Sequence, residues 1–267
     1  MPQKTEKPRF IFHGNAMPFG GRMVSIGGKP FADTVPGPPS GSLAVIGGWT
    51  RAESKGSSYR DVFSWGATLA NSKGELRADG HFITTVTSSI AGVRAKNDPF
   101  PFEAARLSIT MVSDHYSPDE EPSIIATEIV FEDLKLDGQL IEPEWDKDLV
   151  DHPTFASFER EYQNNEKFFR KYQKTLKDPS REATFGDPMP RIDGGYVATS
   201  FVRSLRWKKK KYPGNVLTLK GFGSIYFGEV LMNENNRRVT LVRLAMGSTV
   251  EAEAAYAEAD PNGTWGN

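Results

Sequence analysis

Glu229 is the ionisable residue with the most unusual sequence environment. On an extended strand it would share a face with Ile225, Phe227 and Leu231, three apolar residues that favour a dry surface. A buried carboxylate must pair with a cation or with hydrogen-bond donors, or its pKa rises. Arg243 lies on the predicted partner strand, but the expected register places it on the opposite face. Two interpretations therefore stay open: a structural ion network, or a catalytic or ligand-binding acid.

The remaining groups that could do chemistry are few. The four histidines occur singly, without the close helical pairing of a local zinc motif. His81 and His115 are weak catalytic candidates, because with Glu229 and Arg243 they could line an apolar cavity. The chain has no cysteine and no Gly-x-Ser-x-Gly elbow, which excludes thiolate catalysis and argues against a serine nucleophile. No motif indicates a cofactor.

An acidic segment offers oxygen ligands of the kind that calcium prefers. Its members are Asp114, Asp119, Glu120 and Glu121. The segment lacks the spacing and the glycine of the known calcium loop. We therefore interpret it as solvated loop charge and keep a metal site only as a weak alternative.

A basic run with flanking aromatic residues covers Arg206 to Tyr212 and includes the four lysines Lys208, Lys209, Lys210 and Lys211. Such a combination can grip a phosphate backbone and stack on bases, but it also describes the solvated end of a hairpin. Because 33 basic and 34 acidic residues nearly cancel over the chain, general attraction to nucleic acid is not expected. Nucleic acid is therefore an unlikely partner.

One amphipathic helix is predicted at about 154–177, starting at the N-cap Thr154 and ending before Asp178. A spacing of three and four residues puts a stripe of rings on one face, with Asn165 at its middle. In one interpretation the stripe covers the chain's own sheet; in the other it binds a second chain, with Asn165 fixing the register. The stripe consists of Phe155, Phe158, Tyr162, Phe169, Tyr172 and Leu176.

The rest of the chain reads as β structure. Asp137-Gly138 gives the strongest two-residue hairpin signal, and Asn233 to Asn236 separates two strongly apolar arms. We expect a mainly β fold, an antiparallel sandwich or barrel with the one long helix packed on a sheet, in a single domain over 1–267. The expected strands are 9–12, 43–46, 62–69, 80–93, 106–112, 123–136, 196–207, 216–219, 225–232 and 239–246.

The amino-terminal ten residues are polar and charged, without the apolar core of a signal peptide. No run approaches the ~20 apolar residues of a membrane-spanning helix. We therefore expect a soluble, cytoplasmic protein that does not insert into membranes.

Three segments of the chain resemble a known protein family. Phe12 to Arg22, Gly221 to Glu229 and Arg237 to Arg243 resemble a family of uncharacterised bacterial β-rich proteins. The resemblance implies that both ends of the chain belong to one domain. It implies no activity and transfers no functional residue.

Two classes of function compete. The first is a non-enzymatic β-rich protein that binds a protein partner or assembles as a homo-oligomer, favoured by strands that are apolar on both faces. The second is a small-molecule-binding or isomerase-type enzyme with a ligand cavity inside a β-barrel. We favour the first, since groups suited to catalysis are sparse.

Overall fold

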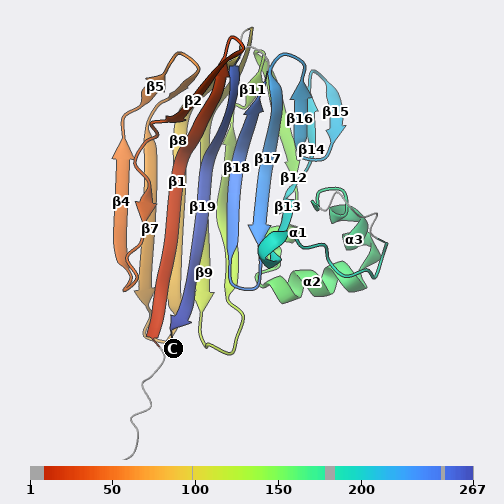
Figure 1. Cartoon of the computed structure of the whole chain (residues 1–267). Coiled ribbons are helices and arrows are strands. Elements are labelled where there is room, and N and C mark those ends of the chain that lie inside the picture. Colours follow the sequence, from red (N-terminus) through yellow and green to blue (C-terminus); the bar gives the residue numbers. More distant parts are fainter. Residues whose placement is uncertain (1–8, 98, 178–183, 248–249, 267) are drawn as a thin grey trace, which may run out of the picture.

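Two antiparallel sheets face each other in the computed structural model, which describes residues 9–97, 99–177, 184–247 and 250–266 (Figure 1). The sheets do not close on each other, so the sandwich is confirmed and the barrel is not formed. The first sheet has eight strands: β13 (Val197–Ser200), β17 (Gly223–Met232), β18 (Arg237–Met246), β19 (Val250–Gly266), β1 (Arg9–Ile26) and β2 (Lys29–Val35) in that order, with β16 (Val216–Leu219) beside β17 and β3 (Gly41–Ser42) beside β1.

The second sheet has eleven strands. Its order is β15 (Lys210–Pro213), β14 (Val202–Trp207), β12 (Gln139–Trp145), β11 (Lys135–Leu136), β9 (Phe100–His115), β8 (Phe82–Asn97), β6 (Phe63–Trp65) and β5 (Ser57–Tyr59), with β10 (Ser123–Glu132) on β9, β7 (Thr68–Leu76) on β8, and β4 (Gly48–Ser54) on β7.

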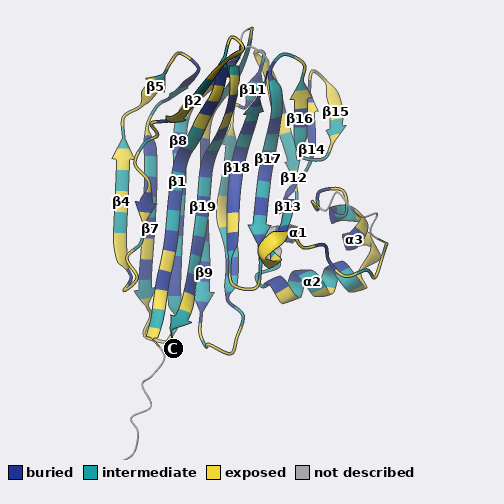
Figure 2. Ribbon diagram, in the orientation of Figure 1, coloured by how far each residue is buried: buried dark blue, intermediate teal, exposed yellow. Residues whose placement is uncertain are grey.

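The long strands β1 and β19 lie against β8 and β9 of the opposite sheet. Buried apolar side chains of both sheets form one continuous core between them (Figure 2). β19 lies between β18 and β1. It pairs with β1 along almost its whole length, from Arg9 opposite Gly266 to Ile26 opposite Val250. No strand was predicted over 250–266, although the alternation of alanine with glutamate at 251–254 has the period of two that marks a strand.

The side-chain alternation reverses halfway along the first sheet. In β17 the buried positions change from Ile225 and Phe227 to Val230 and Met232. The same change occurs on β18, β19 and β1, in one row across the sheet. Gly228 and Ala257 have φ values of 60° and 51° there, which reverses the face of the residues that follow. The row consists of Gly228, Leu241, Ala257 and Pro18.

The helical part differs from the prediction. Instead of one helix there are α1 (Asp148–Asp151), α2 (Phe155–Asn164), α3 (Glu166–Tyr172) and a short 3-10 turn, Asp193–Gly195. Asn165 leaves the helical conformation, and its side chain accepts a hydrogen bond from the Phe168 N–H (3.2 Å). Asparagine favours such an N-cap over a helix interior, which explains why one helix ends and the next begins here. Thr154 caps α2 as predicted, accepting from the Ser157 N–H (3.1 Å).

The helices lie beside the sandwich rather than over the C-terminal hairpin (Figure 1). The predicted arms of that hairpin are confirmed as β17 and β18, but they lie against β14 and β9 of the second sheet. The segment after α3 contacts β13 and not the C-terminal hairpin: the Lys177 N–H donates a hydrogen bond to the Ala198 carbonyl (3.1 Å). Within the described residues, no helix combines the length and apolar character needed to cross a membrane.

Candidate functional site

The aromatic stripe of the predicted helix is buried in the interior of the protein. Phe155, Phe158, Tyr162, Phe169 and Tyr172 are each at most 3% exposed. Because the helix breaks at Asn165, α2 and α3 fold onto each other and their rings meet, as in the pairs Phe158–Tyr172 (5.7 Å) and Tyr162–Phe169 (4.9 Å). This burial favours the internal interpretation of the stripe. A surface available to a partner must therefore be sought elsewhere.

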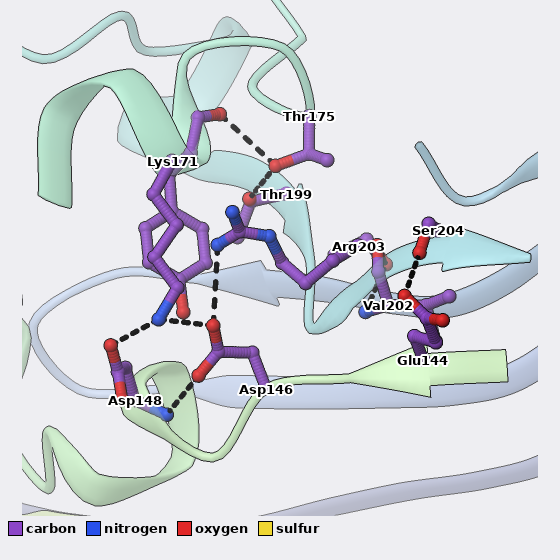
Figure 3. A network of polar contacts seen from close by, with 11 residues as sticks. Glu144, Asp146, Asp148, Lys171, Thr175, Thr199, Val202, Arg203 and Ser204 are labelled. Atoms are coloured by element: carbon purple, nitrogen blue, oxygen red, sulfur yellow. Dashed lines mark hydrogen bonds and ion pairs between the residues drawn. The ribbon is translucent and has the colours of Figure 1, made fainter. Parts of the chain in front are cut away.

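A polar network fixes the helices to the second sheet (Figure 3). Asp146, which follows β12, accepts from Lys171 of α3 and from Arg203 of β14 (3.3 Å). Lys171 also pairs with Asp148 of α1. Burial would raise the pKa of Asp146, but its hydrogen bonds, the one from Lys171 first, outweigh this effect and lower it. Every charge in the network has an opposite partner, so its evident role is to hold α1 and α3 in place.

Glu229 and Arg243 lie on the same face, contrary to the predicted register. Arg243 donates twice to the Glu229 carboxylate (2.6 and 3.0 Å), and Lys177 donates once (2.6 Å). The prediction was wrong because Gly228 reverses the alternation between Phe227 and Glu229. Burial alone would raise the pKa of Glu229, but the hydrogen bonds from both cations outweigh it and lower the pKa. The pairing fits the structural ion network.

The two candidate histidines have separate environments. His81 lies beside Asp114 (Nδ1 to Oδ1 2.7 Å), and this hydrogen bond raises the pKa of His81. His115 is 3% exposed and packs its ring against Phe10 (4.9 Å). Burial lowers the pKa of His115 to about 4, so it is neutral at pH 7. The structure therefore does not bring His81, His115 and Glu229 together in one site.

The acidic segment does not converge either. Asp114 faces His81, while Asp119 and Glu120 lie in an exposed turn. The Glu121 carboxylate accepts from the backbone N–H groups of Phe155 and Ala156, which caps the start of α2. In the described part of the chain, no group of three or more His, Asp or Glu side chains gathers in the way that a metal ion requires.

Between the sheets lies a small apolar cavity. A cavity lined by Met111, Phe201 and Val230 has a volume of only about 10 Å³, room for one water molecule. Arg237 borders the same cavity, and its guanidinium donates to the Ile124 carbonyl (2.7 Å). This cavity is too small for an organic ligand.

The predicted basic run forms the hairpin β14–β15. Lys208 and Lys209 make its two-residue turn, with φ values of 49° and 61°. A groove of about 530 Å³, here called the basic groove, is lined by 139–140, 142 and 206–211. Left-handed backbone costs residues other than glycine roughly 1–2 kcal/mol each, so lysine is an unfavourable choice at both positions. The basic run is therefore the end of a hairpin, as one of its two interpretations had it, but Lys-Lys is not a turn signal and did not locate the turn.

A second surface was also missed. Among the large apolar side chains of the described residues, the most exposed are Ile46 (86%), Trp49 (64%) and Val45 (63%). Val45 and Ile46 lie in the turn before β4, and Trp49 is the second residue of β4. The predicted strand 43–46 is instead a turn, in which the Gly47 N–H donates to the Ala44 carbonyl (2.9 Å). Apolar residues in a turn gain nothing from the core, so their exposure itself needs a reason.

This turn is held rigidly. The Phe12 N–H donates to the Val45 carbonyl (3.0 Å), and Gly47 has φ of 84° with the Phe12 ring closely packed against it. The Trp49 indole N–H donates to the Asn71 side chain (2.5 Å). The backbone of the turn and the Trp49 indole are therefore held in place. The three exposed side chains, Val45, Ile46 and Trp49, are here called the β4 patch.

Comparison with known proteins gives a family but no activity. No curated protein matches the chain. A family profile described as Domain of unknown function (DUF8256) matches residues 10–233, which run from β1 to the end of β17. The match spans most of the chain, and it is consistent with the resemblance to an uncharacterised family. The chain therefore belongs to the DUF8256 family.

Proposed function

We propose that this protein is a non-enzymatic β-sandwich whose copies assemble through the β4 patch and the adjoining edge of β4. The observation that carries the proposal is that the three most exposed large apolar side chains of the described residues lie within five positions, in the turn before one edge strand and at its start. Exposed apolar surface is costly in water, and its burial against a second copy removes that cost.

The edge itself supports the same proposal. β4 pairs with β7 on one side only, and no other described strand of the chain pairs with it. An unpaired edge offers a row of backbone donors and acceptors to another strand. A twofold axis repeats each contact, so the edge must complement itself.

β4 has such self-complementary charges. An antiparallel second copy centred on Ala52 places Arg51 opposite Glu53 of that copy, and Glu53 opposite its Arg51. In this register Trp49 lies opposite Lys55 of the second copy, so each β4 patch packs beside the partner's strand and not on the partner's patch. In the single chain the two residues share one face, and the Arg51 Nε donates to Glu53 (2.6 Å). Both side chains are at least half exposed and can reorient toward a partner.

Charge exchange tests this arrangement. R51E places two carboxylates opposite each other across the interface, so we expect the dimer to dissociate about tenfold more readily. R51E/E53R restores opposite charges and should restore the dimer. Analytical ultracentrifugation over a concentration series measures both. Equal dissociation constants for wild type, R51E and the double variant would contradict pairing through β4.

A further inference from the structure

Five cationic side chains line the basic groove, against one carboxylate, Glu142. The groove includes the Lys208-Lys209 turn, which is linked to the neighbouring Asp137-Gly138 turn by the Lys208–Asp137 ion pair (3.0 Å). The Trp207 indole N–H also joins them, donating to the Leu136 carbonyl (3.2 Å). Such links make the groove a fixed feature and not a fluctuating gap between loops.

The two turns have the same backbone conformation but different residues. Asp137 and Gly138 have φ values of 55° and 66°, close to those of Lys208 and Lys209. Asp-Gly is a favoured pair for a turn with two positive φ values, whereas lysine has no such preference. Folding alone would therefore be served better by a second Asp-Gly or Asn-Gly. Charged residues at positions where the backbone is strained indicate a use for that charge.

Lys208 pairs with Asp137, and the other four cations of the groove fall into two groups. Arg206 and Lys211 both bind Glu144 (2.9 and 2.5 Å), and these contacts, the one with Lys211 first, lower the pKa of that carboxyl to about 2. Lys209 and Lys210 form no ion pair with any described residue, and both are exposed. The first group is held in place, and the second is available to a ligand.

We propose that the basic groove binds a small anion that carries two or more phosphate groups. Consecutive lysines at one hairpin tip give a high density of positive charge, which matches adjacent phosphates better than the single charge per residue of an acidic peptide. A groove of about 530 Å³ has the size of a small-molecule site. The site lies apart from the β4 patch, at the opposite side of the second sheet (Figure 1).

Calorimetric titration with inorganic tripolyphosphate tests the proposal. We expect wild type to bind at low salt, and K208N/K209G to bind at least about tenfold more weakly, since two cations are lost. K210S, which leaves the turn untouched, should also weaken binding. Thermal melts of each variant show that it is folded. The matched control K29S/K167S removes two exposed lysines elsewhere and should bind like wild type.

Three results would overturn the proposal. They are no binding of tripolyphosphate to wild type, equal binding by K208N/K209G, and an equal loss in the control, which would indicate net charge alone. Tighter binding of poly-glutamate than of tripolyphosphate would also reject phosphate as the ligand. A second arm compares vesicles of phosphatidylcholine with and without a phosphoinositide. Binding only to the phosphoinositide vesicles, in addition to free tripolyphosphate, supports the phosphate site and assigns a lipid headgroup as its source.

Discussion

Two edge strands of the second sheet differ in character: β15 lies at one side, and β4 lies at the other side together with the short β5 (Figure 1). β15 carries Lys210, Lys211 and Pro213, residues that hinder pairing with another strand. β4 carries the largely exposed Trp49, and the largely exposed Ile46 lies two residues before β4 begins. β15 is protected by lysines and a proline, whereas β4 has no proline, carries the charge pair Arg51–Glu53 and begins beside exposed apolar side chains. The difference indicates that the β4 edge is the one used for assembly.

Lysine substitutions near the start of β4 would give this edge the character of β15. In I46K/W49K, two lysines replace the apolar side chains, and assembly should weaken about 1,000-fold, or ~4 kcal/mol, because charges cannot be buried there unpaired. Light scattering after size exclusion measures the mass of the variant. V24K, which puts a lysine at an exposed apolar position on β1, serves as the control and should assemble normally.

A change of pH should alter the stability of the region beneath the β4 patch, through the titration of His115. His115 packs on Phe10, which contacts Phe12, and the Phe12 N–H holds Val45. The pKa of His115 falls from 6.5 in the unfolded chain to about 4 in the fold, so the unfolded chain binds more protons between these values. The stabilising contribution is complete above pH 6.5 and is lost as the pH falls toward 4, amounting to about 3 kcal/mol.

Urea unfolding at pH 7 and at pH 4.5 measures this loss. H115F keeps a ring in the same place and removes the titrating group, so its unfolding free energy should depend less on pH over this range. The raised pKa of His81 acts with the opposite sign, adding stability that disappears as the pH rises through that pKa. A wild type whose stability is equal at both pH values, and matches that of H115F, would contradict the buried neutral His115.

The smallest effect concerns the protected edge. K208N/K209G gives the β14–β15 turn a sequence suited to its backbone, so the free energy of unfolding should rise by about 1 kcal/mol, partly offset by the entropy of glycine. Urea denaturation measures the change, with K29S/K167S as the charge control. Stability that falls in K208N/K209G would show that the lysines are there for the fold.

Sequence patterns predicted the β class, the Asp137-Gly138 turn and the hairpin β17–β18, because each has a local signal that tertiary contacts do not override. The helix was predicted as one piece because its apolar spacing continues through Asn165, and only the capping bond to Phe168 shows the break. The sequence could not predict that Glu229 and Arg243 point to the same face of the sheet. The alternation of side chains reverses at Gly228, and this reversal involves one residue from each of four neighbouring strands.

The candidate surfaces were harder to predict for a related reason. Val45 and Ile46 read as a strand because a run of apolar residues gives no sign of whether anything covers it. Their exposure depends on where the turn at Gly47 places them against β1. The basic run was recognised from its composition, but its strained turn became visible only from the backbone angles of Lys208 and Lys209.

The mass of the wild-type protein in solution tests assembly through β4 most directly. Native mass spectrometry at micromolar concentration should give twice the mass of one chain, and the mass should return to that of one chain in I46K/W49K. A wild type that is monomeric over the whole concentration range, or a dimer that persists unchanged in that variant, would contradict the account.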